Sequence, residues 1–381
     1  MGDGGRRGSG DHRRRATIDR RRRPGATQVI ERILRAIATR GLPGSPEGPI
    51  DVPGGEWPSV SRALERERLT GLARSLLSDG TLRLDDESAE RLVDLDALWS
   101  AHTLRAEDVL IDLGRELQER SIDFRVLKGS ALAELSWTIG EARRWVDADV
   151  LVPSDRFDEV IALCLEDGAI RPVSELRAGH DRRFAKSVTL RSSLGPEIDL
   201  HRALVLGPHT FLIPAADLFD RPRLFSVEDL QLSTLSAEAT LIHCCLHATI
   251  AGASRLATLR DIVESYEGTD DVLAAGIAER WHVRPMVVAA GEAVARRLSL
   301  PAHPFVTWSR TLEPTAEELR IASVYARDNR SNRNLAIASI RHIPGRSDRL
   351  RFMVAMAFPS AANRADRGRS WTDQFRRIRP R

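Results

Sequence analysis

The sequence predicts an α+β protein in which a small mixed sheet is flanked by N- and C-terminal helical segments. Apolar residues recur at three- and four-residue spacing before about residue 117 and after about residue 216, as they do on helices that pack against a core. Between these regions lie short apolar runs at 122–127, 145–152 and 197–204, which are bounded by turn residues and too short for typical helices. We therefore expect the strands, and the chemistry they carry, in the middle of the chain.

The two ends of the chain differ from the rest in charge. Of the 381 residues, 42% are hydrophobic and 29% are charged, and the formal net charge is only +3. Arginines nevertheless crowd both ends, so residues 1–26 are predicted to form a disordered basic arm and residues 361–381 a basic tail. Such ends could contact the phosphates of a nucleic acid, but a solvated tail is the favoured interpretation.

Cysteine usage and hydropathy predict a cytoplasmic protein without a membrane partner. The three cysteines have no metal-ligand spacing and no convincing disulfide framework, which suits a reducing compartment. No run of eighteen apolar residues is present, and the N-terminal arginines are not followed by an apolar signal region. Secretion and membrane spanning are therefore not expected.

Three segments are predicted between the basic ends. Residues 27–117 form an N-terminal helical segment, in which apolar stripes alternate with loops rich in glycine and proline. Residues 118–215 form an α/β core in the order strand, glycine turn, helix, strand, helix and antiparallel hairpin. Residues 216–360 form a C-terminal helical domain, in which residues 226–230 are expected to begin a capped helix.

Two acids stand two residues apart in the strand predicted at 145–152, which reads W-V-D-A-D-V-L-V. Side chains at i and i+2 of a strand point to one face, so Asp147 and Asp149 are held side by side. Such a pair either raises the pKa of one acid or recruits a cation, and its oxygen ligands suit Mg²⁺ or Mn²⁺. Surface strands also alternate acids with apolar residues, but an unpaired carboxylate in so apolar a run would be costly. Asp199, on the hairpin, is either a third site acid or an ordinary hairpin residue.

A glycine turn upstream of these acids offers a cradle for phosphate. Gly129 and Ser130 stand at a strand-to-helix junction, where backbone N–H groups meet the positive end of a helix. Lys128 beside them, and Arg143 with Arg144 just before the acid strand, could neutralise a triphosphate. Lysine–glycine turns are common, however, and one of the two arginines is expected on the surface.

Three histidines are candidates for supporting roles. His201 shares a strand face with Asp199, so it is expected to support the acids, to contact a substrate, or to be satisfied in the core. His243 and His247 are four apart on a predicted helix, with Asp261 downstream, so a zinc site is conceivable. The glutamate of the metalloprotease pattern is missing, and helix packing or a polar cluster lining the cleft is therefore favoured over zinc.

These residues together resemble a known family. The features that carry the resemblance are the lysine–glycine turn at 127–129, the basic pair before D-A-D-V-L-V, the D-L-H run at 199–201, and the later His243, His247 and Asp261. They are similar to the uncharacterised nucleotidyltransferase family of bacteria, within the polymerase-β-like nucleotidyltransferase superfamily. The resemblance covers roughly residues 57–360 and is most specific over 128–199.

The resemblance implies a polymerase-β-like nucleotidyltransferase core with assigned residues. Gly129 and Ser130 match the glycine–serine turn of the superfamily. Asp147 and Asp149 match its paired metal ligands, and Asp199 matches its third carboxylate. The interval from Gly129 to Asp147 is longer than the superfamily usually shows.

The resemblance also implies an activity. A nucleoside monophosphate would move from an NTP such as ATP to an acceptor hydroxyl on a small molecule, peptide or protein, by two-metal catalysis with Mg²⁺ or Mn²⁺. Asp199 could accept the proton of that hydroxyl. The alternative is a non-catalytic relative that binds a nucleotide or a partner protein in the same cleft. Metal dependence of nucleotide binding separates the two hypotheses.

Overall fold

The described part of the protein is an α+β structure, which confirms the predicted fold class. The computed structural model describes residues 24–326, 328 and 330–368. The predicted basic arm lies outside these residues up to residue 23, and the predicted basic tail lies outside them from residue 369. Within the described ranges, no helix is both long enough and apolar enough to cross a membrane.

The N-terminal helical segment begins inside the predicted arm, at Pro24. A short parallel strand pair, β1 (Ile50–Asp51) and β2 (Leu82–Arg83), joins its helices. Asp85 caps the longest helix, because its side chain accepts a hydrogen bond of 2.8 Å from the backbone N–H of Ser88. The helices of this segment are α1 (Pro24–Thr39), α2 (Trp57–Glu67), α3 (Thr70–Ser78) and α4 (Asp86–Glu119).

The core sheet is mixed, as predicted. Its strands lie in the order β3 (Arg125–Val126), β4 (Asp147–Leu151), β6 (Glu197–His201) and β5 (Ser187–Arg191). Strands β4 and β6 run parallel, whereas β3 pairs with β4 and β5 with β6 in antiparallel fashion. The predicted hairpin is therefore confirmed. The helices between these strands are α5 (Gly129–Leu135), α6 (Phe157–Glu166) and α7 (His180–Phe184).

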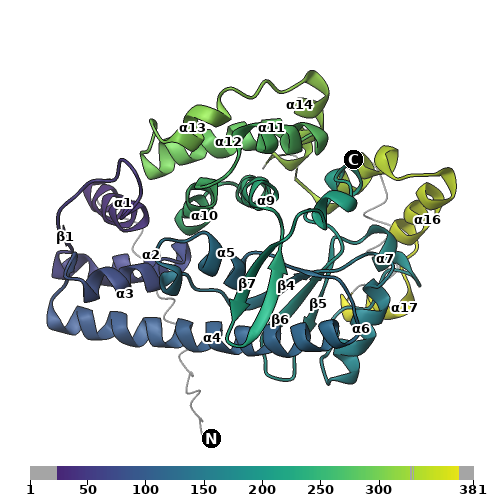
Figure 1. The fold of residues 1–381 in the computed structure, drawn as a ribbon, viewed down its shortest axis with the longest axis horizontal. Helices are drawn as coiled ribbons and strands as arrows, with labels where there is room; N and C mark the ends of the chain where they lie inside the picture. Colours follow the sequence, from purple (N-terminus) through teal and green to yellow (C-terminus); the bar gives the residue numbers. More distant parts are fainter. Residues whose placement is uncertain (1–23, 327, 329, 369–381) are drawn as a thin grey trace, which may run out of the picture.

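The two faces of the sheet pack against different helices. On β4, Ala148 and Val150 belong to a buried cluster that includes apolar residues of α4 and α6. Leu151 points the other way and joins a cluster built largely from the N- and C-terminal helices. Figure 1 shows α4 running below the sheet and α9 (Ala237–Ile250) and α10 (Leu256–Tyr266) lying above it. Asp147 and Asp149 share the face of Leu151, so they point toward α9 and α10 and away from α4.

The prediction that residues 226–230 begin a helix was wrong. This segment forms a hairpin of β7 (Arg223–Val227) and β8 (Leu230–Thr234), in which buried and more exposed side chains alternate. A serine followed by two acids suggested a helix cap, but here the period-two alternation decides the structure. Glu228 takes the left-handed backbone of the turn, with φ 49°. The hairpin packs against β3 and α5, so structure attached to the core extends beyond residue 215.

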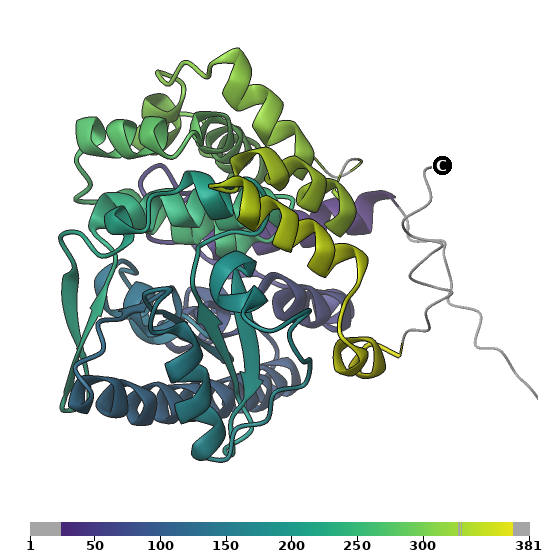
Figure 2. The same ribbon diagram turned by 90° about the vertical axis from the view of Figure 1, so that its right-hand side faces the viewer.

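The C-terminal part is otherwise helical, as predicted, and its last described helix lies within the predicted basic tail. That helix is held to the loop after α6: the backbone N–H of Ser360 donates to the carbonyl of Leu176 at 2.7 Å, and that of Ser174 donates to Asp366 at 2.8 Å. Figure 2 shows the C-terminal helices in yellow on the face turned to the viewer, with this last helix at the lower right. The remaining helices are α8 (His209–Leu212), α11 (Asp271–Arg280), α12 (Arg284–Ala293), α13 (Pro304–Ser309), α14 (Ala316–Ala322), α15 (Asn332–Ser339), α16 (Arg346–Ala357) and α17 (Ala361–Asp366).

Candidate functional site

Two of the three predicted acids lie directly opposite each other. Asp149 on β4 and Asp199 on β6 are register partners in the parallel pair, so their side chains share one face of the sheet. Asp149 is buried, with 6% of its surface exposed. Asp199 accepts a hydrogen bond of 3.1 Å from the hydroxyl of Thr189 on β5. The strand pairing thus brings together two carboxylates that are distant in the sequence.

His201 joins these two acids directly. Its Nε2 lies 2.8 Å from Oδ1 of Asp149 and 3.0 Å from Oδ2 of Asp199. One potential ligand atom from each of the three residues lies within 4.8 Å of the others, which forms a candidate metal cluster. The sequence left open whether this histidine supports the acids or fills the core. Within the described structure it does both, because it is 1% exposed and contacts both acids.

The backbone orients the His201 ring. Its Nδ1 lies 3.2 Å from the carbonyl oxygen of Ala203, so Nδ1 carries a proton and donates it. Nε2 then faces two carboxylates, either as the donor of a second proton or with a lone pair directed at a cation. Burial and the nearby Lys186 act to lower the pKa of His201, but its hydrogen bonds to the two acids outweigh them and raise it. Because both neighbours of Nε2 are carboxylate oxygens, a proton on Nε2 would bridge the acids when no metal ion is bound.

Two lysines flank the acid pair. The Nζ atom of Lys128 lies 2.9 Å from Oδ2 of Asp149, and that of Lys186 lies 3.4 Å from Oδ2 of Asp199. Lys128 has φ 56° and ψ −139°, a backbone region that is unfavourable for non-glycine residues by roughly 1–3 kcal/mol. Burial acts to raise the pKa of Asp149, but Lys128 and His201 outweigh it and lower that pKa well below its ordinary value. The strained turn therefore places a cation where it keeps Asp149 ionised.

Asp147 stands apart from this cluster. Its side chain is half-buried, and it forms no ion pair or hydrogen bond with any described residue. Burial, and next the charge of Asp149, raise its pKa. Asp147 thus faces the same side as Asp149 but keeps its oxygens available to a ligand.

A cavity of about 130 Å³ opens beside Asp147, much larger than the space that one water needs. All three segments of the chain contribute to its wall. Its lining includes Arg68 from the N-terminal helices, Lys128, Gly129 and Asp147 from the core, and His247 and Arg255 from the C-terminal helices. The cavity therefore carries charges of both signs.

The two arginines predicted to bind phosphate are already paired with acids. Arg143 donates to Asp261 from Nε at 2.9 Å and from Nη2 at 3.2 Å, and its Nη1 donates to the carbonyl of Gly129 at 2.9 Å. Arg144 donates to both oxygens of Asp96, at 3.0 and 2.8 Å. Both arginines line the cavity. Their charges are largely balanced, so their evident role is to position the loop that leads into β4.

The glycine–serine turn contributes only its first residue to the cavity. Gly129 begins α5 and lies against the ring of Trp145, where a Cβ would come 3.5 Å from the nearest ring carbon. Ser130 is 1% exposed, and its hydroxyl has no hydrogen-bond partner among the described residues. Ser130 is also absent from the lining of the cavity. Of the turn predicted to hold phosphate, only Lys128 and Gly129 therefore line the cavity.

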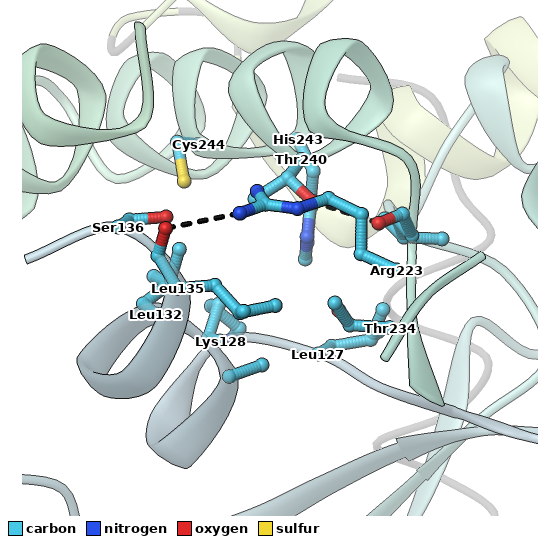
Figure 3. A pocket seen from close by; sticks show the side chains of 12 residues that line it. Leu127, Lys128, Leu132, Leu135, Ser136, Arg223, Thr234, Thr240, His243 and Cys244 are labelled. Atoms are coloured by element: carbon cyan, nitrogen blue, oxygen red, sulfur yellow. Dashed lines mark hydrogen bonds between the residues drawn. The ribbon is translucent and has the colours of Figure 1, made fainter. Parts of the chain in front are cut away.

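The two histidines of α9 lie on either side of Lys128. His243 faces a small cavity of about 10 Å³, seen in Figure 3 with Lys128 below it, which has room for about one water. His247 lines the main cavity. Burial, and next the charge of Lys128, lower the pKa of His243 well below its ordinary value and that of His247 to about 3. Asp261 is engaged by Arg143 and by the indole of Trp137 at 2.8 Å, so the favoured polar cluster agrees with the contacts better than zinc does.

Three cationic side chains at the site were missed from the sequence. Lys186 could have been found from the sequence, because it and Lys128 are the only lysines in a chain with 57 lysines and arginines. Both lysines contact the acid pair. No feature of the sequence pointed to Arg68 or Arg255. Their place at the cavity depends on contacts between helices that are distant in the sequence.

A mixed sheet that gathers carboxylates, a histidine and cations beside a cavity defines a protein that can hold a metal ion and an anionic ligand. The chain belongs to the family described as uncharacterised nucleotidyltransferase, whose model matches residues 53–298. The resemblance found in the sequence is thereby confirmed at the level of the family. A search of the curated proteins found no match.

Among solved structures, four chains match this one. One is described as an antigenic nucleotidyltransferase-like protein from Paracoccidioides brasiliensis. The two chains are 13% identical, the match covers 57% of this chain and 97% of that chain, and the TM-score is 0.32. At so low a TM-score, the likeness carries no weight for the residues of the site.

Proposed function

We propose that the protein transfers a nucleoside monophosphate from an NTP to an acceptor hydroxyl with release of pyrophosphate, using a divalent ion bound at the acid cluster. The observation that carries this proposal is the convergence of Asp149, Asp199 and His201, with ligand atoms within 4.8 Å of one another, beside a cavity that contains Asp147. Membership of the nucleotidyltransferase family supports the reaction class.

The donor set fits a divalent ion. Carboxylates suit Mg²⁺ and Mn²⁺, and an added imidazole is also acceptable to Mn²⁺. The Nδ1 proton of His201 is held by the carbonyl of Ala203, which leaves Nε2 directed at Asp149 and Asp199. Such a backbone partner is common behind metal-binding histidines, because it fixes the ring and the tautomer. Asp147 pairs with none of the described residues and would complete the set from the cavity side.

Each site residue has a role in the proposed reaction. A bound divalent ion would polarise the phosphate and lower the pKa of the acceptor hydroxyl. Lys128 and Lys186 keep Asp149 and Asp199 ionised and in place. Of the acids, Asp147 has a raised pKa, whereas that of Asp199 is lowered by His201 and Lys186 despite burial. We therefore prefer Asp147 to Asp199 as the acceptor of the hydroxyl proton.

Titration of Mn²⁺ into the purified protein tests the metal part of this proposal. We expect wild-type protein to bind Mn²⁺ and both Asp149→Asn and Asp199→Asn to bind it at least about tenfold more weakly, because each loses a charged ligand. Asp348→Asn is a matched control, since Asp348 pairs with the exposed Arg351 and with no other residue of the described ranges. Equal Mn²⁺ affinity in all four proteins would contradict the proposal.

A second candidate is a non-catalytic relative that binds a nucleotide or a partner protein. The charge balance at the cluster favours it, because Lys128, Lys186 and protonated His201 already neutralise Asp149 and Asp199 without a metal ion. On this hypothesis, nucleotide affinity is the same with and without Mg²⁺. A nucleotide affinity that rises with Mg²⁺ would exclude it.

A further inference from the structure

The main cavity contains two arginines without an acidic partner. Arg68 and Arg255 both line it, and neither forms an ion pair with any described residue. They differ in this from Arg143 and Arg144 in the same wall, which are bound to Asp261 and Asp96. Two guanidinium groups are therefore left to interact with whatever enters the cavity.

A buried contact between distant helices brings these arginines together. The side chain of Glu67, the last residue of α2, accepts a hydrogen bond of 2.9 Å from the backbone N–H of Leu256, the first residue of α10. Glu67 is 8% exposed. Arg68 directly follows Glu67, and Arg255 directly precedes Leu256, so the contact joins the two positions that carry the guanidinium groups.

The backbone at Arg68 has a conformation that is unusual for an arginine. Arg68 ends α2 in the left-handed region, with φ 56° and ψ 46°. Glycine is the usual residue there, because an L side chain is unfavourable in this region by roughly 1–2 kcal/mol. An arginine at this position directs a charged side chain toward the cavity, at some cost in backbone energy.

Like charges face each other across this part of the cavity. Burial, and next the charge of Arg255, lower the pKa of Arg68. Asp147, which also lines the cavity, acts to raise the pKa of Arg68, yet the two form no ion pair. The cavity thus carries the acids Asp147 and Asp149 as well as the two arginines. A ligand that brings both a cation and several negative charges would complement this lining.

We propose that Arg68 and Arg255 bind the polyphosphate of the nucleotide, taking the role that the sequence assigned to Arg143 and Arg144. The inference rests on the proposed function, because that function supplies the triphosphate. Guanidinium groups match phosphate oxygens through paired N–H donors, and they stay charged both where half-buried, as at Arg68, and where exposed, as at Arg255. The N-terminal and C-terminal helical segments would then close jointly on one ligand, with the acids of the core at its other end.

Binding of inorganic tripolyphosphate, measured by calorimetry in EDTA, tests this assignment without a metal ion. We expect Arg68→Gln and Arg255→Gln each to weaken binding by about 10- to 100-fold, because each removes charge-assisted hydrogen bonds. Arg66→Gln is the matched control. It lies two residues before Arg68 and removes the same charge, but its side chain is 67% exposed, does not line the cavity, and has only a 3.8 Å contact with Glu67.

Two outcomes would overturn the inference. One is wild-type protein that does not bind tripolyphosphate, and the other is a loss in Arg68→Gln and Arg255→Gln no greater than in Arg66→Gln. Arg68→Lys keeps the charge without the paired donors, and we expect it to bind more tightly than Arg68→Gln if the protein is folded equally well. Failure of the proposed function would give a different result. The ATP affinity of the wild type would then be unchanged by Mg²⁺, while Arg68→Gln and Arg255→Gln would still bind tripolyphosphate more weakly than the wild type does.

Discussion

The buried pair of Arg143 and Asp261 yields the most specific stability prediction. Both side chains are 11% exposed, and two hydrogen bonds of 2.9 and 3.2 Å join them. Asp261→Asn leaves the guanidinium buried beside a neutral amide, and breaking a buried pair in this way costs roughly 3–5 kcal/mol. An amide oxygen in the place of Oδ1 can still accept from both Trp137 and Nε of Arg143, so we expect a loss near the lower end, about 3 kcal/mol in free energy of unfolding.

Urea unfolding followed by tryptophan fluorescence measures this loss, with the free energy obtained by linear extrapolation. Asp348→Asn is the control, because its ion pair with Arg351 is 2.8 Å long but the two side chains are 36% and 60% exposed. Exposed pairs contribute about 0–1 kcal/mol. A loss in Asp261→Asn as small as that in the control would refute the view that α10 holds the loop before β4 through this pair.

Two further predictions concern the parts that position the site. Gly140→Ala should destabilise the protein by at least about 1 kcal/mol in urea unfolding, because a Cβ at Gly140 would overlap the carbonyl oxygen of Ala133. An unchanged urea midpoint would contradict the close packing of this loop on α5. Lys128→Met should lower the free energy of unfolding without metal by about 3 kcal/mol, because it leaves Asp149 buried without the lysine charge. Mn²⁺ should raise the melting temperature of this variant more than that of wild type. Equal shifts in melting temperature would contradict the placement of the metal at Asp149.

The alternation of side chains on the acid strand could be predicted from the sequence. A period of two places Asp147 and Asp149 on one face whatever the strand packs against, and the structure places them there. The hairpin of β5 and β6 was also predictable, because turn residues separate two short apolar runs, whereas the pairing of β4 with β6 was not. Local pattern was therefore sufficient for the face of each residue on β4 and for the hairpin of β5 and β6.

The partners of the charged residues could not be predicted in this way. Arg143 and Arg144 look suited to phosphate until α10 and α4 bring Asp261 and Asp96 against them. The direct contact of His201 with Asp149 requires the register of β4 on β6, which no local pattern specifies. The hairpin at 223–234 was missed because a serine and two acids imitate a helix cap over a very short stretch.

The most direct test of the proposed function is calorimetric titration of the protein with ATP, GTP, CTP and UTP, each with and without Mg²⁺, repeated on Asp147→Asn. This variant has no ion pair or hydrogen bond to lose among the described residues, so its fold should be retained. We predict that at least one nucleotide binds more tightly in the presence of Mg²⁺ and that the gain disappears in Asp147→Asn. Nucleotide binding that is indifferent to Mg²⁺ in both proteins would contradict a metal-dependent nucleotidyltransferase.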